Sequence, residues 1–405
     1  MSATPALLRN RNFILLWLAS IVGNFALAVA MLAETWYVVK TLGAKEQLGL
    51  VMIAGSVPRI ALMAVGGVLA DRMKRSKIIL VSLGARVLML FGLVGLLAIN
   101  RLDIWALTAF AFLYGALDAF FWPARDALIP AIVPEQDLTR ANSIMLTTNQ
   151  VGLVFGPVLG GVLLAMMSYE MIFSLTGGML ALATACIALI NEPFVKKVRE
   201  VGSTMLIELK EGVQYAIKTP VLRALMLIYA AANLLFMGPL ALGIPIIVTE
   251  NLNGEPATLS FLQSAFAAGM VIGGILLTMY PPTKKRLLMI TIIIGLEGVF
   301  LSLLAHTHWV WVAVGLQALI GLGVAGNNVP MMSLIQQYSD KDKLGRVMSL
   351  NSMASMGLTP ISYAMVTGLL SIHLSMAWIM PIFGLTMAAL MLLLTLKMPI
   401  VREAN

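Results

Sequence analysis

Charged residues are scarce in this chain of 405 residues, because Asp, Glu, Lys and Arg together make up only 11% of it. Soluble domains carry about 25% charged residues, so this scarcity excludes a soluble globular protein. The single cysteine, Cys186, excludes an intrachain disulfide, and the three histidines lack partners at metal-ligand spacing. A Walker loop and a G-x-S-x-G nucleophile motif are also missing, so we expect no enzyme and no bound cofactor.

Apolar residues are abundant: they make up 60% of the chain, and the mean hydropathy is +0.93. A helical membrane span needs about 20 apolar residues and satisfies its own backbone hydrogen bonds. The sequence therefore predicts an all-α polytopic membrane protein. Its twelve predicted transmembrane helices cover residues 13–38, 48–70, 78–99, 104–131, 143–167, 171–191, 221–249, 258–280, 287–305, 309–336, 347–370 and 376–397.

The net charge of +8 does not indicate a nucleic-acid partner, because the basic residues form short clusters between apolar runs. One alternating set of connections holds nearly all the Lys and Arg. The opposite set holds only Lys40, Lys45 and Arg101. The positive-inside rule then predicts that both termini are cytoplasmic.

The longest polar stretch lies at the midpoint of the chain and divides it in two. We predict an N-terminal six-helix bundle over 1–195, a cytoplasmic linker over 196–219 and a C-terminal six-helix bundle over 220–405. Within the linker, LIELKEGVQYAI is typical of a short amphipathic surface helix. It either tethers the two bundles or serves as a regulatory docking site.

The two halves repeat a weak pattern at an offset of 206 residues. Gly115 recurs as Gly321, and Arg140 recurs as Arg346. Parallel repeats of six helices are a known transporter plan, with the substrate near the middle of the membrane. This pattern predicts a pseudo-symmetric pair of bundles.

The strongest local signal is the glycine motif of the fifth span, which comprises Gly152, Gly156, Pro157, Gly160 and Gly161. Three of its glycines recur at intervals of four residues and share one helix face, where another backbone can approach closely. The proline removes a helix hydrogen bond and bends the span. Ordinary small-residue packing is the simpler interpretation of the same pattern.

A second motif, the loop motif, runs from Gly67 to Arg75 at the cytoplasmic end of the second span. Its glycine allows tight packing, and its aspartate suits the positive end of a neighbouring helix. A membrane-anchoring cluster of cations is the alternative, but it leaves the aspartate unexplained. The predicted cytoplasmic gate consists of Gly67, Asp71, Arg72, Arg75, Asp126 and Arg346.

Within this gate we expect Asp126 to pair with Arg72. Asp126 is not expected to pair with its neighbour Arg125, because adjacent helix residues point about 100° apart.

Both motifs resemble those of the major facilitator superfamily. The glycine motif resembles the antiporter motif that is associated with exporters. Residues 123–143 and 344–349 resemble the branch that holds macrolide efflux proteins and enterobactin-type siderophore exporters. The resemblance covers the whole chain. It implies two six-helix bundles, alternating access and export.

Ionisable residues inside a membrane are functional candidates by default. The proton-coupling candidates are Asp118, Glu34, Arg59 and Arg86. For Asp118 the alternative is a fixed ion pair with Arg59 or Arg86, and for Glu34 it is a position facing headgroup water. For a further acid, Glu297 in the ninth span, we expect a structural hydrogen bond, and a role in transport is the alternative.

Uncharged polar and aromatic side chains mark a predicted substrate cavity, because a few amides orient a ligand in an apolar pocket. Any single amide is also compatible with a helix–helix hydrogen bond. These candidates are Asn24, Phe121, Trp122, Asn149, Gln150, Asn233, Gln317, Asn327, Asn328 and Asn351.

The sequence therefore predicts a monomeric secondary transporter in the inner or plasma membrane that exports amphiphilic small molecules such as drugs, macrolides or siderophores. We expect an ion gradient, carried by protons, to drive it. The alternatives are a lysophospholipid or other lipid transporter of the same superfamily, a proton-coupled importer of a polar solute, and a non-transporting receptor or scaffold.

Overall fold

A computed structural model describes residues 7–193, 213–340 and 343–403 of the chain. Within these ranges the long elements are α-helices and no strand occurs, as predicted. The chain divides into two compact units, Met1–Arg199 and Glu200–Asn405. Some side chains inside the helices lie outside the description, including those of the gate candidates Asp71 and Arg346.

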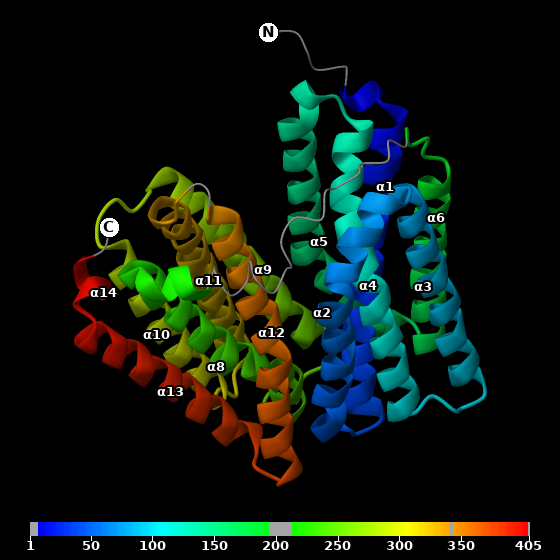
Figure 1. Ribbon diagram of the computed structural model, residues 1–405. Helices are drawn as coiled ribbons and strands as arrows, with labels where there is room; N and C mark the ends of the chain where they lie inside the picture. The colour runs from blue at the N-terminus through cyan, green and yellow to red at the C-terminus, as the bar shows by residue number, and fades with distance from the viewer. Residues whose placement is uncertain (1–6, 194–212, 341–342, 404–405) are drawn as a thin grey trace. The chain divides into compact units, whose positions relative to one another are not determined.

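The first unit is a bundle in which α1 packs against α5 and α6, α2 packs against α4, and α3 packs against α4 and α6 (Figure 1). Helix α1 continues through a π-helical turn, Tyr37–Thr41. The six helices are α1 (Arg11–Trp36), α2 (Leu48–Arg72), α3 (Arg75–Ala98), α4 (Ile104–Ile132), α5 (Leu138–Met166) and α6 (Tyr169–Ala188).

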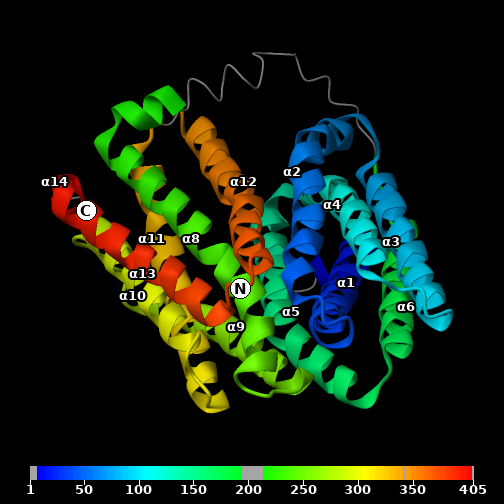
Figure 2. The ribbon, with the colours of Figure 1, turned by 90° about the horizontal axis from the view of Figure 1, so that it is seen from below.

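The second unit repeats these contacts: α8 packs against α12 and α13, α9 packs against α11, and α10 packs against α11 and α13 (Figure 2). Its helices are α8 (Pro220–Glu250), α9 (Pro256–Met279), α10 (Arg286–Leu304), α11 (Val310–Tyr338), α12 (Leu344–Ser371), α13 (Met376–Lys397) and the short α14 (Pro399–Glu403).

Polar residues placed directly before apolar runs fix several helix starts. The Asn10 side chain accepts hydrogen bonds from the backbone at the start of α1, Asp103 does so for α4, and Ser168 does so for α6. Each cap satisfies N–H groups that the first helical turn leaves without a partner. The local sequence therefore sets these three boundaries.

Each of the twelve predicted ranges coincides with one helix. The fifth begins earlier than predicted, at Leu138 instead of 143, because its first turn is polar and extends the helix beyond the apolar run. Among the described residues, ten helices are long and apolar enough to cross a membrane, and α2 and α12 are not among them. Of the predicted linker, 196–212 lies outside the described residues and 213–218 is helical.

The offset of 206 residues also holds between corresponding helices of the two units. Helix α11 begins and ends 206 residues after α4. Gly115 lies where α4 meets α2, and Gly321 lies where α11 meets α9. A Cβ added at these glycines would stand 1.8 Å from Gly55 O and 1.9 Å from Phe266 O, respectively. Both crossings therefore need a glycine at the repeated position.

A serine of α12 makes hydrogen bonds to two backbone groups of α8. The Ser362 hydroxyl of α12 accepts from Gly238 N at 2.7 Å and donates to Leu234 O at 2.7 Å. These are two backbone groups that an α-helix joins to each other. The next residue, Pro239, has no N–H and therefore donates no helix hydrogen bond. The Ser362 hydroxyl thus lies beside a position where α8 lacks one backbone hydrogen bond.

Candidate functional site

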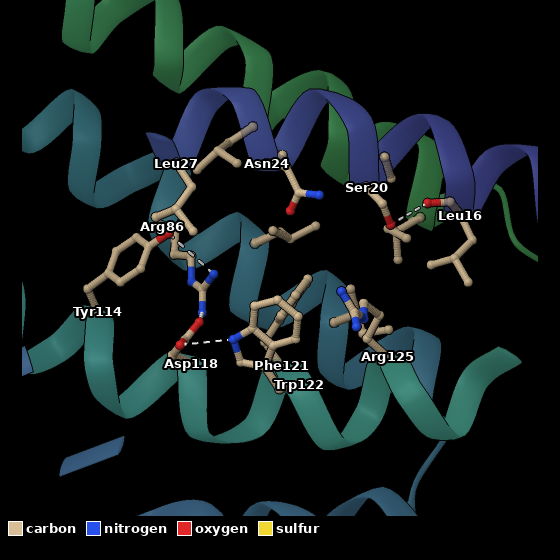
Figure 3. A pocket seen from close by; sticks show the side chains of 16 residues that line it. Leu16, Ser20, Asn24, Leu27, Arg86, Tyr114, Asp118, Phe121, Trp122 and Arg125 are labelled. Atoms are coloured by element: carbon tan, nitrogen blue, oxygen red, sulfur yellow. Dashed lines mark hydrogen bonds and ion pairs between the residues drawn. The ribbon is translucent and has the colours of Figure 1, made fainter. Parts of the chain in front are cut away.

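A pocket inside the first unit is lined by α1, α3, α4 and α6 (Figure 3). Helix α4 supplies most of its polar and aromatic groups, at positions that recur every three or four residues and therefore share one helix face. Apolar residues of α1, α3 and α6 make up much of the remaining wall. The α4 residues are Tyr114, Asp118, Phe121, Trp122 and Arg125.

Asp118 is the centre of a charged cluster that joins three helices. Its carboxylate lies 2.8 Å from Arg86 Nη2 of α3 and 3.2 Å from Arg59 Nη1 of α2. Trp122 Nε1 donates to Asp118 Oδ2 at 3.0 Å. The fixed ion pair considered as an alternative for Asp118 is therefore present, and it involves both arginines.

Arg86 is enclosed by aromatic rings as well as by its counter-ion. Its guanidinium carbon lies 4.3 Å from the centroid of Tyr114 and 5.1 Å from that of Phe121. The residue is 3% exposed, and its Nε has no hydrogen-bond partner. Cation–π contacts and one carboxylate thus hold a charge that is otherwise costly inside an apolar bundle.

The expected absence of an Arg125–Asp126 pair is wrong. Arg125 donates to Asp126 Oδ1 through Nε at 3.1 Å and Nη2 at 2.8 Å, while its guanidinium lies over the Trp122 ring at 4.2 Å. Although the two Cβ atoms point in different directions, the long arginine side chain folds back to the adjacent carboxylate. The expected pair between Asp126 and Arg72 is not among the ion pairs of the described side chains, and Arg72 is exposed.

Glu34 lies apart from this cluster, on α1. Its Oε1 is buried and has no hydrogen-bond partner. The two candidate proton-coupling carboxylates therefore differ, because Asp118 is paired with two cations whereas one oxygen of Glu34 has no hydrogen-bond partner.

The glycine motif brings α5 against α1. A Cβ added at Gly156 would lie 2.4 Å from the Cβ of Ala28. One added at Gly152 would lie 2.9 Å from the Cβ of Asn24, and one at Gly160 would lie 2.8 Å from Leu32 Cδ2. The spacing of four residues on α5 thus matches the same spacing on α1. Pro157 and Gly161 are buried within the same helix.

Polar contacts accompany this crossing. Asn24 lines the pocket and donates to Asn149 Oδ1 at 2.9 Å, and Gln150 is half-buried. Trp17 donates to the Thr148 hydroxyl at 2.8 Å. Sequence reasoning missed this last pair, although an indole N–H inside a membrane needs an acceptor.

The remaining gate candidates are used differently from what was expected. No atom lies within 4 Å of a Cβ added at Gly67, so the described part of the first unit provides no close contact for this glycine. The close contact belongs to Gly66, whose added Cβ would lie 2.2 Å from Ala119 O of α4. Arg75 is buried and pairs with Glu192 at 3.3 Å.

Glu192 was also missed by sequence reasoning. Its carboxylate accepts from the backbone N–H groups of Arg75 at 3.3 Å and Ser76 at 2.9 Å, and from the Ser76 hydroxyl at 2.9 Å. A carboxylate at a helix N-terminus satisfies unpaired N–H groups and complements the helix dipole. A lone acid between the end of the sixth span and a proline was the available signal.

The polar candidates of the second unit are scattered. Asn233 donates to the Tyr229 carbonyl of its own helix at 2.9 Å, and Asn328 is exposed. Gln317 and Asn351 are each buried with one polar atom that has no partner. Asn327 donates to Glu297 Oε1 at 2.7 Å, which is the kind of contact expected for Glu297.

The sequence of this chain resembles efflux proteins over most of its length. Macrolide efflux protein A of Streptococcus pyogenes is 25% identical, over 84% of this chain and 84% of its own. Multidrug efflux pump Tap of Mycolicibacterium fortuitum is 24% identical, over 86% of each chain. Enterobactin exporter EntS of Escherichia coli O1:K1 / APEC is 28% identical, over 80% of this chain and 76% of its own.

Solved transporter structures share the fold. A POT family transporter in complex with 5-aminolevulinic acid matches with a TM-score of 0.75 and 12% identity, over 97% of each chain. A bacterial homologue of the iron transporter ferroportin in an inward-facing state matches with a TM-score of 0.72 and 15% identity, over 96% of this chain and 98% of that one.

The many apolar helices and these similarities define a multi-pass membrane protein of a transporter family. The model of the Major Facilitator Superfamily matches residues 16–356 and, in a second match, 226–405. The chain belongs to this superfamily, as its motifs predicted, and it is homologous to macrolide, multidrug and enterobactin efflux proteins.

Proposed function

We propose that this protein is a proton-driven exporter of amphiphilic small molecules. It works by alternating access, as a monomer with twelve spans in the cytoplasmic membrane and with both termini in the cytoplasm. Near-full-length homology to three proteins named for efflux carries this proposal, and it favours transport over a receptor or scaffold. The packing of the glycine motif against α1 supports it, because this motif resembles that of exporters.

The pocket of the first unit suits one end of an amphiphile. Apolar side chains of α1, α3 and α6 line the pocket, and Trp122 and Phe121 of α4 add flat aromatic rings to its wall. The lining includes two guanidinium groups, of Arg86 and Arg125, and one carboxylate, of Asp118. A site of this kind favours a compound with an aromatic body and an acidic or hydrogen-bond-accepting group.

Of the two candidate carboxylates Glu34 and Asp118, Glu34 is the better proton carrier. Protonation of Asp118 would leave Arg86 and Arg59 facing each other without a counter-ion, which is costly in an apolar bundle. Protonation of Glu34 neutralises a half-buried carboxylate that has one buried oxygen without a partner, and it breaks no ion pair among the described side chains. We therefore assign proton exchange to Glu34 and a fixed structural charge to Asp118.

Inside-out vesicles with an imposed proton gradient and a pH-sensitive dye test this function. A panel of amphiphilic drugs, macrolides and siderophores is added one compound at a time. We expect at least one compound to dissipate the gradient, and we expect Glu34→Gln to abolish this response. Glu135→Gln is the matched control, because Glu135 is exposed in the turn between α4 and α5. If no compound of the panel changes the proton gradient and none accumulates inside the vesicles, proton-driven export of amphiphiles is ruled out.

A further inference from the structure

Glu297 is a buried acid enclosed between two helices of the second unit. It lies on α10 and is 3% exposed. Asn327 of α11 donates to its Oε1 at 2.7 Å. Gly323, one turn earlier on α11, leaves room for the carboxyl, since an added Cβ there would stand 2.8 Å from the same oxygen. The sequence of α11 thus provides both a donor and a space for this side chain.

No charged residue lies at the depth of Glu297 on the helices packed against it. Helix α11 contains no Asp, Glu, Lys, Arg or His, and its one titratable residue, Tyr338, is its last residue. On α10 itself, Arg286 is eleven residues away, which corresponds to about 16 Å along the helix axis. The titratable groups on the other packed helices are Arg223, Tyr229 and Glu250 of α8, Lys397 of α13, and Arg402 and Glu403 of α14.

These charged groups all lie near helix ends, so an ionised Glu297 would have no counter-ion at its own depth on the described helices that pack against it. Burial of an unpaired carboxylate costs far more than one neutral amide hydrogen bond returns. A protonated carboxyl avoids this cost and still accepts from Asn327. We propose that Glu297 binds a proton in this conformation, with Asn327 positioning the carboxyl. The further step, release of this proton during the transport cycle, rests on the proposed function.

The internal repeat relates this acid to a permanent charge at the equivalent position of the first unit. Glu297 is the twelfth residue of α10, and Arg86 is the twelfth residue of α3. Each side chain reaches the following helix, where Arg86 meets Asp118 and Glu297 meets Asn327. The first unit thus has a fixed ion pair where the second unit has an acid and an amide. Only the second arrangement can gain or lose a proton without breaking a pair of charges.

Infrared spectroscopy of the purified full-length protein tests the bound proton. At neutral pH we expect a C=O stretching band of a protonated carboxylic acid that disappears in Glu297→Gln and persists in the control Glu135→Gln. The band should shift to higher frequency in Asn327→Leu, because the hydrogen bond to the carboxyl is lost. Loss of carboxylate bands in Glu297→Gln, with no change in the acid band, would overturn the proposal. If Glu297→Gln does not fold, an acid band unaffected by Asn327→Leu overturns it equally.

The vesicle assay separates proton binding from proton release. Release predicts that Glu297→Gln loses the proton flux driven by a compound that the wild type exports. Undiminished flux in this variant would overturn release and leave a proton that only stabilises the contact between α10 and α11. If no compound in the panel drives a flux in the wild type, the proposed function fails. The infrared result still decides whether the proton is bound.

Discussion

The contact between Gly156 and Ala28 is the closest point of the crossing between α1 and α5, and Gly156→Ala tests it. The added Cβ would lie 2.4 Å from the Ala28 Cβ, whereas ordinary contact begins at 3.4 Å. The helices would have to separate by roughly 1 Å in a tightly packed interior. Overpacking of this kind costs about 1–3 kcal/mol. We therefore expect a lower melting temperature and weaker export.

Two further variants make this prediction specific. Gly178→Ala on α6 is the matched control, because no atom lies within 4 Å of its added Cβ. Removal of a helical glycine there should be neutral or stabilising by about 0.5–1 kcal/mol. Ala28→Gly should rescue Gly156→Ala, since the Ala28 Cα lies at 3.9 Å from the added Cβ. The two substitutions should therefore be strongly non-additive.

The assay is thermal unfolding of the detergent-purified variants, followed by transport in proteoliposomes. Equal melting temperatures for Gly156→Ala and Gly178→Ala would refute the packing explanation of the glycine motif. So would a double variant that is no more stable than Gly156→Ala alone. If stability is rescued but export is not, the motif has a role in transport beyond the separation of these two helices.

Three other predictions follow from the buried polar contacts. Asp118→Asn should destabilise the first unit by about 3–5 kcal/mol. Adding Arg86→Gln should restore part of this loss in a double-mutant cycle of thermal unfolding, and full additivity would contradict the ion pair. Glu192→Gln should cost about 1–3 kcal/mol, because an amide cannot accept at both of its polar atoms; an unchanged melting temperature would argue against the helix cap. Ser362→Ala should speed hydrogen exchange at the Gly238 amide, because it removes an acceptor of that N–H; equal exchange in both proteins would argue against this contact.

The architecture of each unit was predictable because it depends on properties that are local in sequence. Apolar run length locates the helices, and the recurrence of Gly115 as Gly321 indicates the repeat. The interval of four residues in the glycine motif places Gly152 and Gly156 on one face, and the structure shows the partner helix at that face. None of these inferences depends on knowing how each helix is rotated about its own axis relative to its neighbour.

The polar contacts were harder to predict because they depend on helix rotation and on side-chain reach. The sequence left Arg59 and Arg86 as alternative partners of Asp118, and the structure uses both. The pair between Arg125 and Asp126 was missed because Cβ direction was taken as side-chain direction, which fails for a residue as long as arginine.

The contacts at residues 191 and 192 have a mechanical consequence for the first unit. Asn191 and Asn12 exchange hydrogen bonds of 2.8 and 3.1 Å at the start of α1, while Glu192 holds the start of α3. Both residues follow α6 and lie just before residue 193, where the described part of the first unit ends. Force transmitted along the chain between the units therefore reaches three helix ends together and not α6 alone. A pull at residue 193 should turn the bundle as one body, without peeling α6 from its neighbours.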